Sequence, residues 1–229
     1  MNYEFIYTAF VWTHIAAGAV ALVLFWCAAF SRKGSPFHKS CGRIYLIAMV
    51  GVIITAVPLS VVLFARGQPV VGTFMAYLVV LVSLTCRNSW QAVQLKRDFE
   101  AYVGTGLKVL ATAAAIAGLI VIAGGLYAGI AVLVGFGVIG PILAWQAWKL
   151  IRNGPDAPNW WLKEHFGNMI GNGVATHIAF LQVGMVRLLP ELDLGIVQNL
   201  GWFGPLVVAA IAGAWLGRRY RLPPRQMQP

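Results

Sequence analysis

The chain has 229 residues, of which 59% are apolar, 12% aromatic and only 10% charged, and its mean hydropathy is +0.76. A soluble domain carries about 25% charged residues, so this composition cannot cover a water-exposed surface and excludes a soluble enzyme. It also excludes a disordered chain, which requires low hydrophobicity. The composition is therefore that of an integral membrane protein. In such a protein the first explanation of a formal net charge of +10 is orientation, because basic residues concentrate on the cytoplasmic side of the membrane.

Seven apolar stretches are long enough to cross about 30 Å of hydrocarbon. In chain order we expect spans at 7–30, 44–65, 70–87, 109–127, 130–150, 161–186 and 203–216, the third continuing as a more polar helix through Leu95. Only a glycine-rich, uncharged turn around 124–129 separates the fourth span from the fifth, and the sixth span is the least apolar. The pattern predicts an all-α integral membrane protein, a bundle of seven transmembrane helices that forms one domain over residues 1–229.

The basic residues divide unequally between the two sides that alternating spans define. Of the 17 Lys and Arg residues, 15 fall on one side, and only Arg66 and Arg187 fall on the other. Because basic residues concentrate in cytoplasmic loops, we predict a cytoplasmic C-terminus and an N-terminus outside. The basic residues lack the aromatic interleaving of a nucleic-acid-binding face, so the expected partner is the lipid bilayer and not a nucleic acid.

The three cysteines, Cys27, Cys41 and Cys86, all fall near the predicted cytoplasmic side, where structural disulfides are rare. His38 and Cys41 have a spacing found in metal sites, but no CxxC or HxxxH motif completes such a site. We therefore favour small buried residues at these positions and expect no metal site there.

The four histidines sort by expected depth into two pairs. Counted from the estimated span midpoints, His14 and His177 come out slightly outside the bilayer centre, and His38 and His165 come out near the inner surface. Haem iron takes axial imidazoles, so one histidine on each of two helices can clamp a porphyrin between them. The pattern predicts cofactor binding, haem b, at His14, His38, His165 and His177. His165 and His177 are 12 residues apart, roughly 120° around one helix, which is a poor match for two haems on one face.

A polar stripe follows the sixth span, because His165, Asn168, Asn172 and Thr176 are spaced for one helix face. Interhelical hydrogen bonding explains it, and a substrate path through Asn168, Asn172 and Thr176 is the alternative. No Asp or Glu is expected deep in any span, which argues against a carboxylate-based ion pathway. The chain also has no Walker loop, HExxH or GxSxG motif, so no catalytic residue is assigned and enzymatic activity is left open.

Two blocks of the sequence resemble an uncharacterised family of bacterial multi-pass membrane proteins, a domain of unknown function. The first is the run 14–18 followed by Arg32-Lys33-Gly34, His38, Gly42-Arg43 and the segment 45–49, and the second contains Trp160-Trp161, His165, Met169, the run 178–180 and Leu189-Pro190. The resemblance implies a polytopic inner-membrane protein without an established activity. His14, His38 and His165 match histidine positions of the family pattern, whereas His177 falls where the pattern has an apolar or small residue.

Three functions stay open at this point. The first is a b-type haem subunit that transfers electrons through paired histidine ligands. The second is a transporter of small molecules or metals that uses the polar stripe. The third is a non-catalytic accessory or assembly subunit of a larger membrane protein complex.

Overall fold

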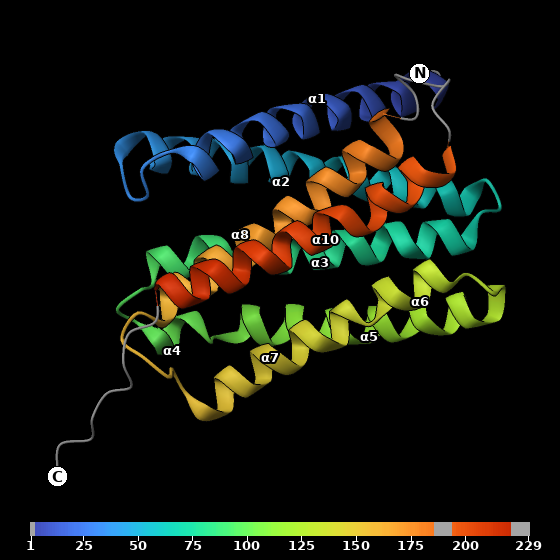
Figure 1. Cartoon of the computed structure of the whole chain (residues 1–229). Coiled ribbons are helices and arrows are strands. Elements are labelled where there is room, and N and C mark those ends of the chain that lie inside the picture. The colour runs from blue at the N-terminus through green and yellow to red at the C-terminus, as the bar shows by residue number, and fades with distance from the viewer. Residues whose placement is uncertain (1–2, 186–193, 221–229) are drawn as a thin grey trace, which may run out of the picture.

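A computed structural model of the chain describes residues 3–185 and 194–220 (Figure 1). These residues form helices joined by turns, with no strand among them. In chain order the helices are α1 (Tyr3–Phe30), α2 (Pro36–Ala65), α3 (Pro69–Gln94), α4 (Phe99–Tyr102), α5 (Thr105–Ala128), α6 (Ala131–Gly137), α7 (Ile139–Asn153), α8 (Trp160–Ala179), the π-helical η1 (Phe180–Met185) and α10 (Leu194–Arg219).

Six helical stretches in the described part of the chain are long and apolar enough to cross a membrane. They are Glu4–Phe30, Pro36–Ala65, Pro69–Gln94, Phe99–Ala128, Ala131–Asn153 and Leu200–Arg219. They coincide with the first five expected spans and the seventh, which makes the protein an all-helical, multi-pass membrane protein. The expected sixth span, 161–186, corresponds to α8 and η1 and does not reach the same apolarity; its last residue, Val186, lies outside the described residues.

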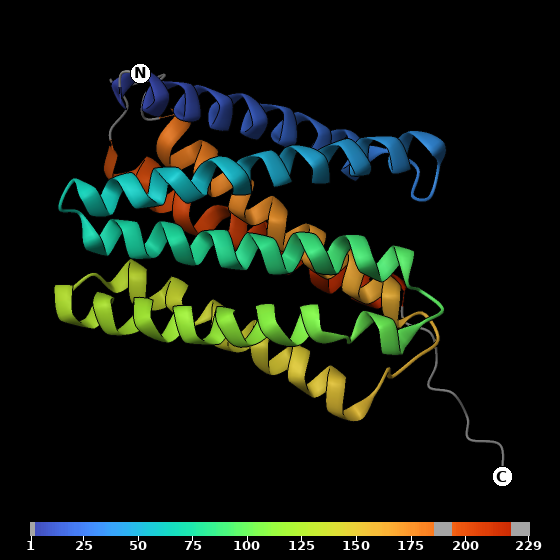
Figure 2. The same ribbon diagram turned by 180° about the vertical axis from the view of Figure 1, so that it is seen from behind.

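The least apolar long helix, α8, lies inside the bundle. In order, α1 packs against α2, α2 against α3, α3 against α5, and α5 against both α6 and α7. Helix α8 leaves this order, because it packs against α3 and α10 and touches α1. Seen from behind, α2 and α3 are in front of α8 and α10 (Figure 2). Polar side chains are costly in hydrocarbon, so a helix that carries a polar stripe is stabilised where other helices cover it.

The turns alternate between the two ends of the bundle. Residues 31–35, 95–98 and 154–159 lie at the same end as the last turn of α10, and we call this the basic end (Figure 1). A hydrogen bond from Asn159 Nδ2 to the Tyr220 carbonyl (2.9 Å) ties two of these segments together. Among the described Lys and Arg residues, only Arg66 lies at the opposite end, where it pairs with Glu4 at 3.8 Å. Arg187, Arg221 and Arg225 lie outside the described residues.

Local sequence determines the turn from α1 to α2. Lys33 Nζ donates to the carbonyls of Ala28 (3.0 Å) and Ala29, which are left free where α1 ends. Ser35 then caps α2, since its Oγ accepts from the amide of His38 at 3.1 Å, and Pro36 occupies the first helical position, where no amide hydrogen is required. The turn therefore fixes the backbone of His38 directly.

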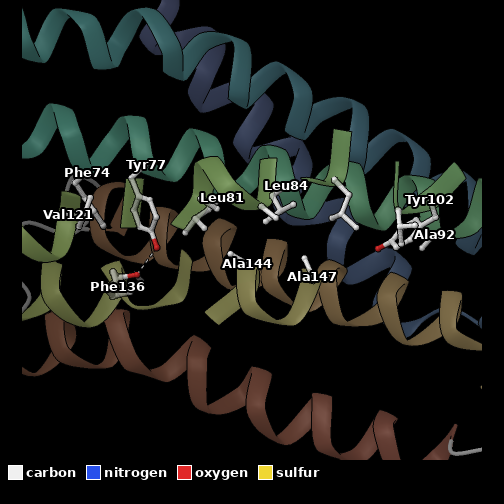
Figure 3. Close-up of a cluster of buried hydrophobic side chains, with 14 of the residues drawn as sticks. Phe74, Tyr77, Leu81, Leu84, Ala92, Tyr102, Val121, Phe136, Ala144 and Ala147 are labelled. Carbon is white, nitrogen blue, oxygen red and sulfur yellow. Dashed lines mark hydrogen bonds between the residues drawn. The ribbon is translucent and has the colours of Figure 1, made fainter. Parts of the chain in front are cut away.

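The expected fifth span, 130–150, is not one regular helix, because it breaks at Val138 between α6 and α7. Tyr77 of α3 inserts its hydroxyl into the break, donating to the Phe136 carbonyl (2.8 Å) and accepting from the Gly140 amide (2.8 Å) (Figure 3). Those two groups would bond to each other in a continuous helix, so the tyrosine replaces a helical hydrogen bond. Pro141, which follows, has no amide hydrogen and also disfavours a regular turn.

Candidate functional site

The four histidine side chains share one arrangement, in which Nδ1 is hydrogen-bonded within the protein. The Nδ1 partners are the Thr55 hydroxyl for His14 (2.9 Å), the Ala28 carbonyl for His38 (3.0 Å), the Ser89 carbonyl for His165 (3.0 Å) and the Gly173 carbonyl for His177 (2.6 Å). A carbonyl oxygen only accepts, so in a neutral imidazole Nδ1 carries the proton and Nε2 keeps its lone pair. This is the tautomer that a haem- or metal-ligating histidine adopts when a second group orients its ring.

His38 and His165 both lie at the basic end of the bundle. His38 is in the first turn of α2, held against the end of α1 by Ala28 and by the Ser31 hydroxyl at 3.4 Å. His165 is in the second turn of α8, held against α3. His38 and Lys33 are near enough to His165 to act on it electrostatically. The two imidazoles belong to different helices and lie at the same end of the bundle.

His14 and His177 do not come together. The His177 ring contacts Phe25 and Trp26 of α1, with ring centroids 5.4 and 5.3 Å apart. His14 lies 11 and 12 residues earlier on α1, which is about 16–18 Å along the helix axis. The expected shared depth of this pair is therefore wrong. Counting residues assumes parallel helices, whereas α8 crosses α1 obliquely (Figure 1).

His177 nevertheless has an unusual environment. Its Nε2 is buried and has no hydrogen-bond partner within the described part of the chain. Phe25 fits closely against the same helix, because a Cβ built on Gly173 would lie 2.4 Å from its ring. His177 is thus enclosed by aromatic rings on the side that faces α1.

His38 and His165 supply the type of donor that a b-type haem takes. Two imidazoles that offer Nε2 from separate helices match the axial ligation of b-type haem. No group of three or more His, Cys, Asp or Glu that suits a metal ion occurs among the described residues, and an iron held by a porphyrin needs only two.

The polar stripe of α8 is sealed by packing over most of its length. Asn172 is fully buried, and its Oδ1 accepts from the Thr85 hydroxyl (2.5 Å) and the Cys86 thiol (3.7 Å) of α3. Thr176 is also buried; its hydroxyl donates to the Asn172 carbonyl (2.9 Å) and lies 3.4 Å from the Tyr45 hydroxyl of α2. These contacts describe an interhelical hydrogen-bond network.

Asn168, the remaining residue of the proposed substrate path, is half-buried. It is hydrogen-bonded to Glu164, a residue that the sequence does not single out as a functional candidate. The Asn168 Nδ2 donates to the carbonyl of Glu164 (2.8 Å), and the Glu164 carboxylate accepts from the Tyr102 hydroxyl at 2.9 Å. Arg87 binds the Tyr102 carbonyl at 2.7 Å. A cavity of about 40 Å³, large enough for a water molecule, has Asn88, Gln146, Glu164 and Asn168 in its wall.

Glu164 is the fifth residue of α8 and lies near the basic end, so it does not contradict the expectation that no Asp or Glu lies deep in a span. The sequence signal is weak, because Glu164 follows Lys163 near a predicted helix end and resembles a solvated charge. The tertiary structure places side chains of α3, α4, α5 and α7 around Glu164.

The three thiols are free, with Cys41 and Cys86 buried and Cys27 half-buried. Comparison with protein-family models, curated proteins and solved structures finds no significant match to the chain. The fold and the sites described above thus define its class, an all-helical multi-pass membrane protein with four Nδ1-bonded histidines.

Proposed function

We propose that the protein is a b-type haem electron-transfer protein with His38 and His165 as axial ligands. The observation that carries the proposal is that two imidazoles from separate helices lie at the basic end, each with Nδ1 bonded to a backbone carbonyl. Of the four histidines predicted from the sequence, this proposal keeps one pair as iron ligands. His14 and His177 are left out because they lie far apart.

The roles of the protein groups follow from their contacts. The carbonyls of Ala28 and Ser89 hold the two rings and fix the tautomer, so that each Nε2 is available to iron. Bound haem would supply a one-electron couple, and two histidine ligands leave no open position for a substrate. Electron transfer is therefore the activity that this ligand set supports.

We further propose that the chain crosses the bacterial inner membrane seven times, with α8 as the additional span. The basic end would face the cytoplasm, with the N-terminus outside. Support comes from the concentration of Lys and Arg at that end and from the position of α8 between α3 and α10.

The experiment is purification from cells supplied with a haem precursor, followed by an absorption spectrum and a pyridine haemochrome assay. We expect about one haem per chain and a low-spin spectrum. His38→Ala and His165→Ala should each remove the low-spin signal, whereas the matched control His14→Ala should keep it. Folded protein without a Soret band would overturn the proposal. If that haem-free protein copurifies stoichiometrically with a larger complex, the accessory role replaces it.

A further inference from the structure

A shallow groove follows the end of α1 and the turn into α2. Its volume is about 540 Å³, and its wall includes Trp26, Phe30, Ser31, Arg32, Ser35 and Phe37. It lies at the basic end, beside the polar contacts of His38 but outside the region between His38 and His165.

The floor of the groove is aromatic and open. The Trp26 and Phe30 rings stack at a centroid distance of 5.1 Å and an angle of 18°. Phe30 is 82% exposed and Phe37 60% exposed, so neither ring serves the protein core. Such rings are well suited to contact acyl chains at the level where the membrane meets the headgroups.

The rim of the groove is cationic and has no compensating charge. No Asp or Glu occurs in the sequence between Glu4 and Asp98, a stretch that contains α1 from its third residue onward and all of α2 and α3. Arg32 is exposed and makes no ion pair within the described part of the chain, and Lys39 and Arg43 follow on α2. Lys33 differs, because its amine is already used on the carbonyls at the end of α1.

The Ser35 hydroxyl adds a donor beside this charge. The Ser35 Oγ accepts from the His38 amide, which leaves its hydroxyl proton for a second partner. A guanidinium and a hydroxyl above an apolar floor are complementary to a phosphodiester joined to acyl chains.

We propose that this groove is a binding site for an anionic phospholipid. The headgroup phosphate contacts Arg32 and Ser35, and an acyl chain lies over Phe30 and Phe37. The cationic rim favours an anionic headgroup over a zwitterionic one, and the aromatic floor favours a lipid over free phosphate. The site does not depend on haem.

The test uses the full chain, delipidated in detergent and titrated with phosphatidylglycerol or phosphatidylcholine while bound lipid is counted by native mass spectrometry. We expect tighter binding of phosphatidylglycerol. Arg32→Gln should weaken it about fivefold, as expected for one cation near an anionic headgroup, and Phe30→Ala should weaken both lipids. The matched control is Lys149→Gln, which removes an exposed cation at the same end but outside the groove and should leave affinity unchanged.

Several results would overturn the assignment. Equal affinity for the two lipids would show that the cationic rim does not select the headgroup. Equal losses of affinity in Arg32→Gln and Lys149→Gln would indicate attraction to the whole basic end. Full displacement by millimolar inorganic phosphate would identify a simple anion site. Unchanged thermal unfolding of Arg32→Gln serves as the control for folding.

Discussion

The packing of α5 against α7 depends on glycines, so a substitution at Gly140 tests this helix contact directly. A Cβ built on Gly140 would lie 2.2 Å from the Ala114 carbonyl oxygen and 3.0 Å from Cε2 of Tyr77. Ordinary contact begins at 3.4 Å, so α7 has to move by about 1.2 Å to accept one methyl group. Both groups in its path are held by the structure, since one is helix backbone and the other is the tyrosine that bridges the α6–α7 break.

We therefore expect Gly140→Ala to lower the free energy of unfolding. Overpacking of a close contact costs about 1–3 kcal/mol, which in a chain of this size corresponds to a fall in Tm of about 2–12 °C. The same substitution at Gly124 of α5 is the matched control, because a Cβ there contacts nothing within 4 Å. Gly124→Ala should raise stability by about 0.5–1 kcal/mol, because alanine loses less backbone entropy than glycine in a helix.

The assay is thermal unfolding in detergent followed by the fluorescence of the nine tryptophans. Both variants replace a glycine with an alanine. A difference in sign between their changes in unfolding free energy is therefore attributable to the close contact at Gly140. If Gly140→Ala were as stable as Gly124→Ala, the close approach of α5 and α7 would be refuted.

Three further substitutions test separate contacts by the same unfolding assay. Tyr77→Phe removes the hydroxyl at the α6–α7 break and should cost about 1–3 kcal/mol, because it leaves two buried backbone groups unpaired; a neutral result would mean that they find other partners. Asn172→Ala deprives the Thr85 hydroxyl of its acceptor and opens a small cavity, so a loss of about 1–3 kcal/mol is expected, and transport lost without any loss of stability would instead favour a substrate path. Ser35→Ala removes the cap of α2 and should cost about 1 kcal/mol, whereas Ser35→Thr, which keeps the hydroxyl, should be close to wild type.

Much of the fold is determined by local sequence. A run of apolar residues satisfies its backbone in hydrocarbon only as a helix, so hydropathy alone predicts the six apolar stretches. Turn residues such as Ser35 and Pro36 define where α2 begins, because capping depends on neighbours in the chain. The grouping of basic residues at one end follows from alternating spans and needs no tertiary information.

The candidate site depends on the tertiary structure. Which histidines lie near each other depends on the tilt and rotation of α8 relative to α1 and α2. Counting residues along the chain gives neither the tilt nor the rotation of a helix. The enclosure of Glu164 depends likewise on which helices pack beside α8. Hydropathy and capping are properties of adjacent residues and can be predicted from the chain, whereas these contacts join residues many positions apart and are decided only when whole helices pack.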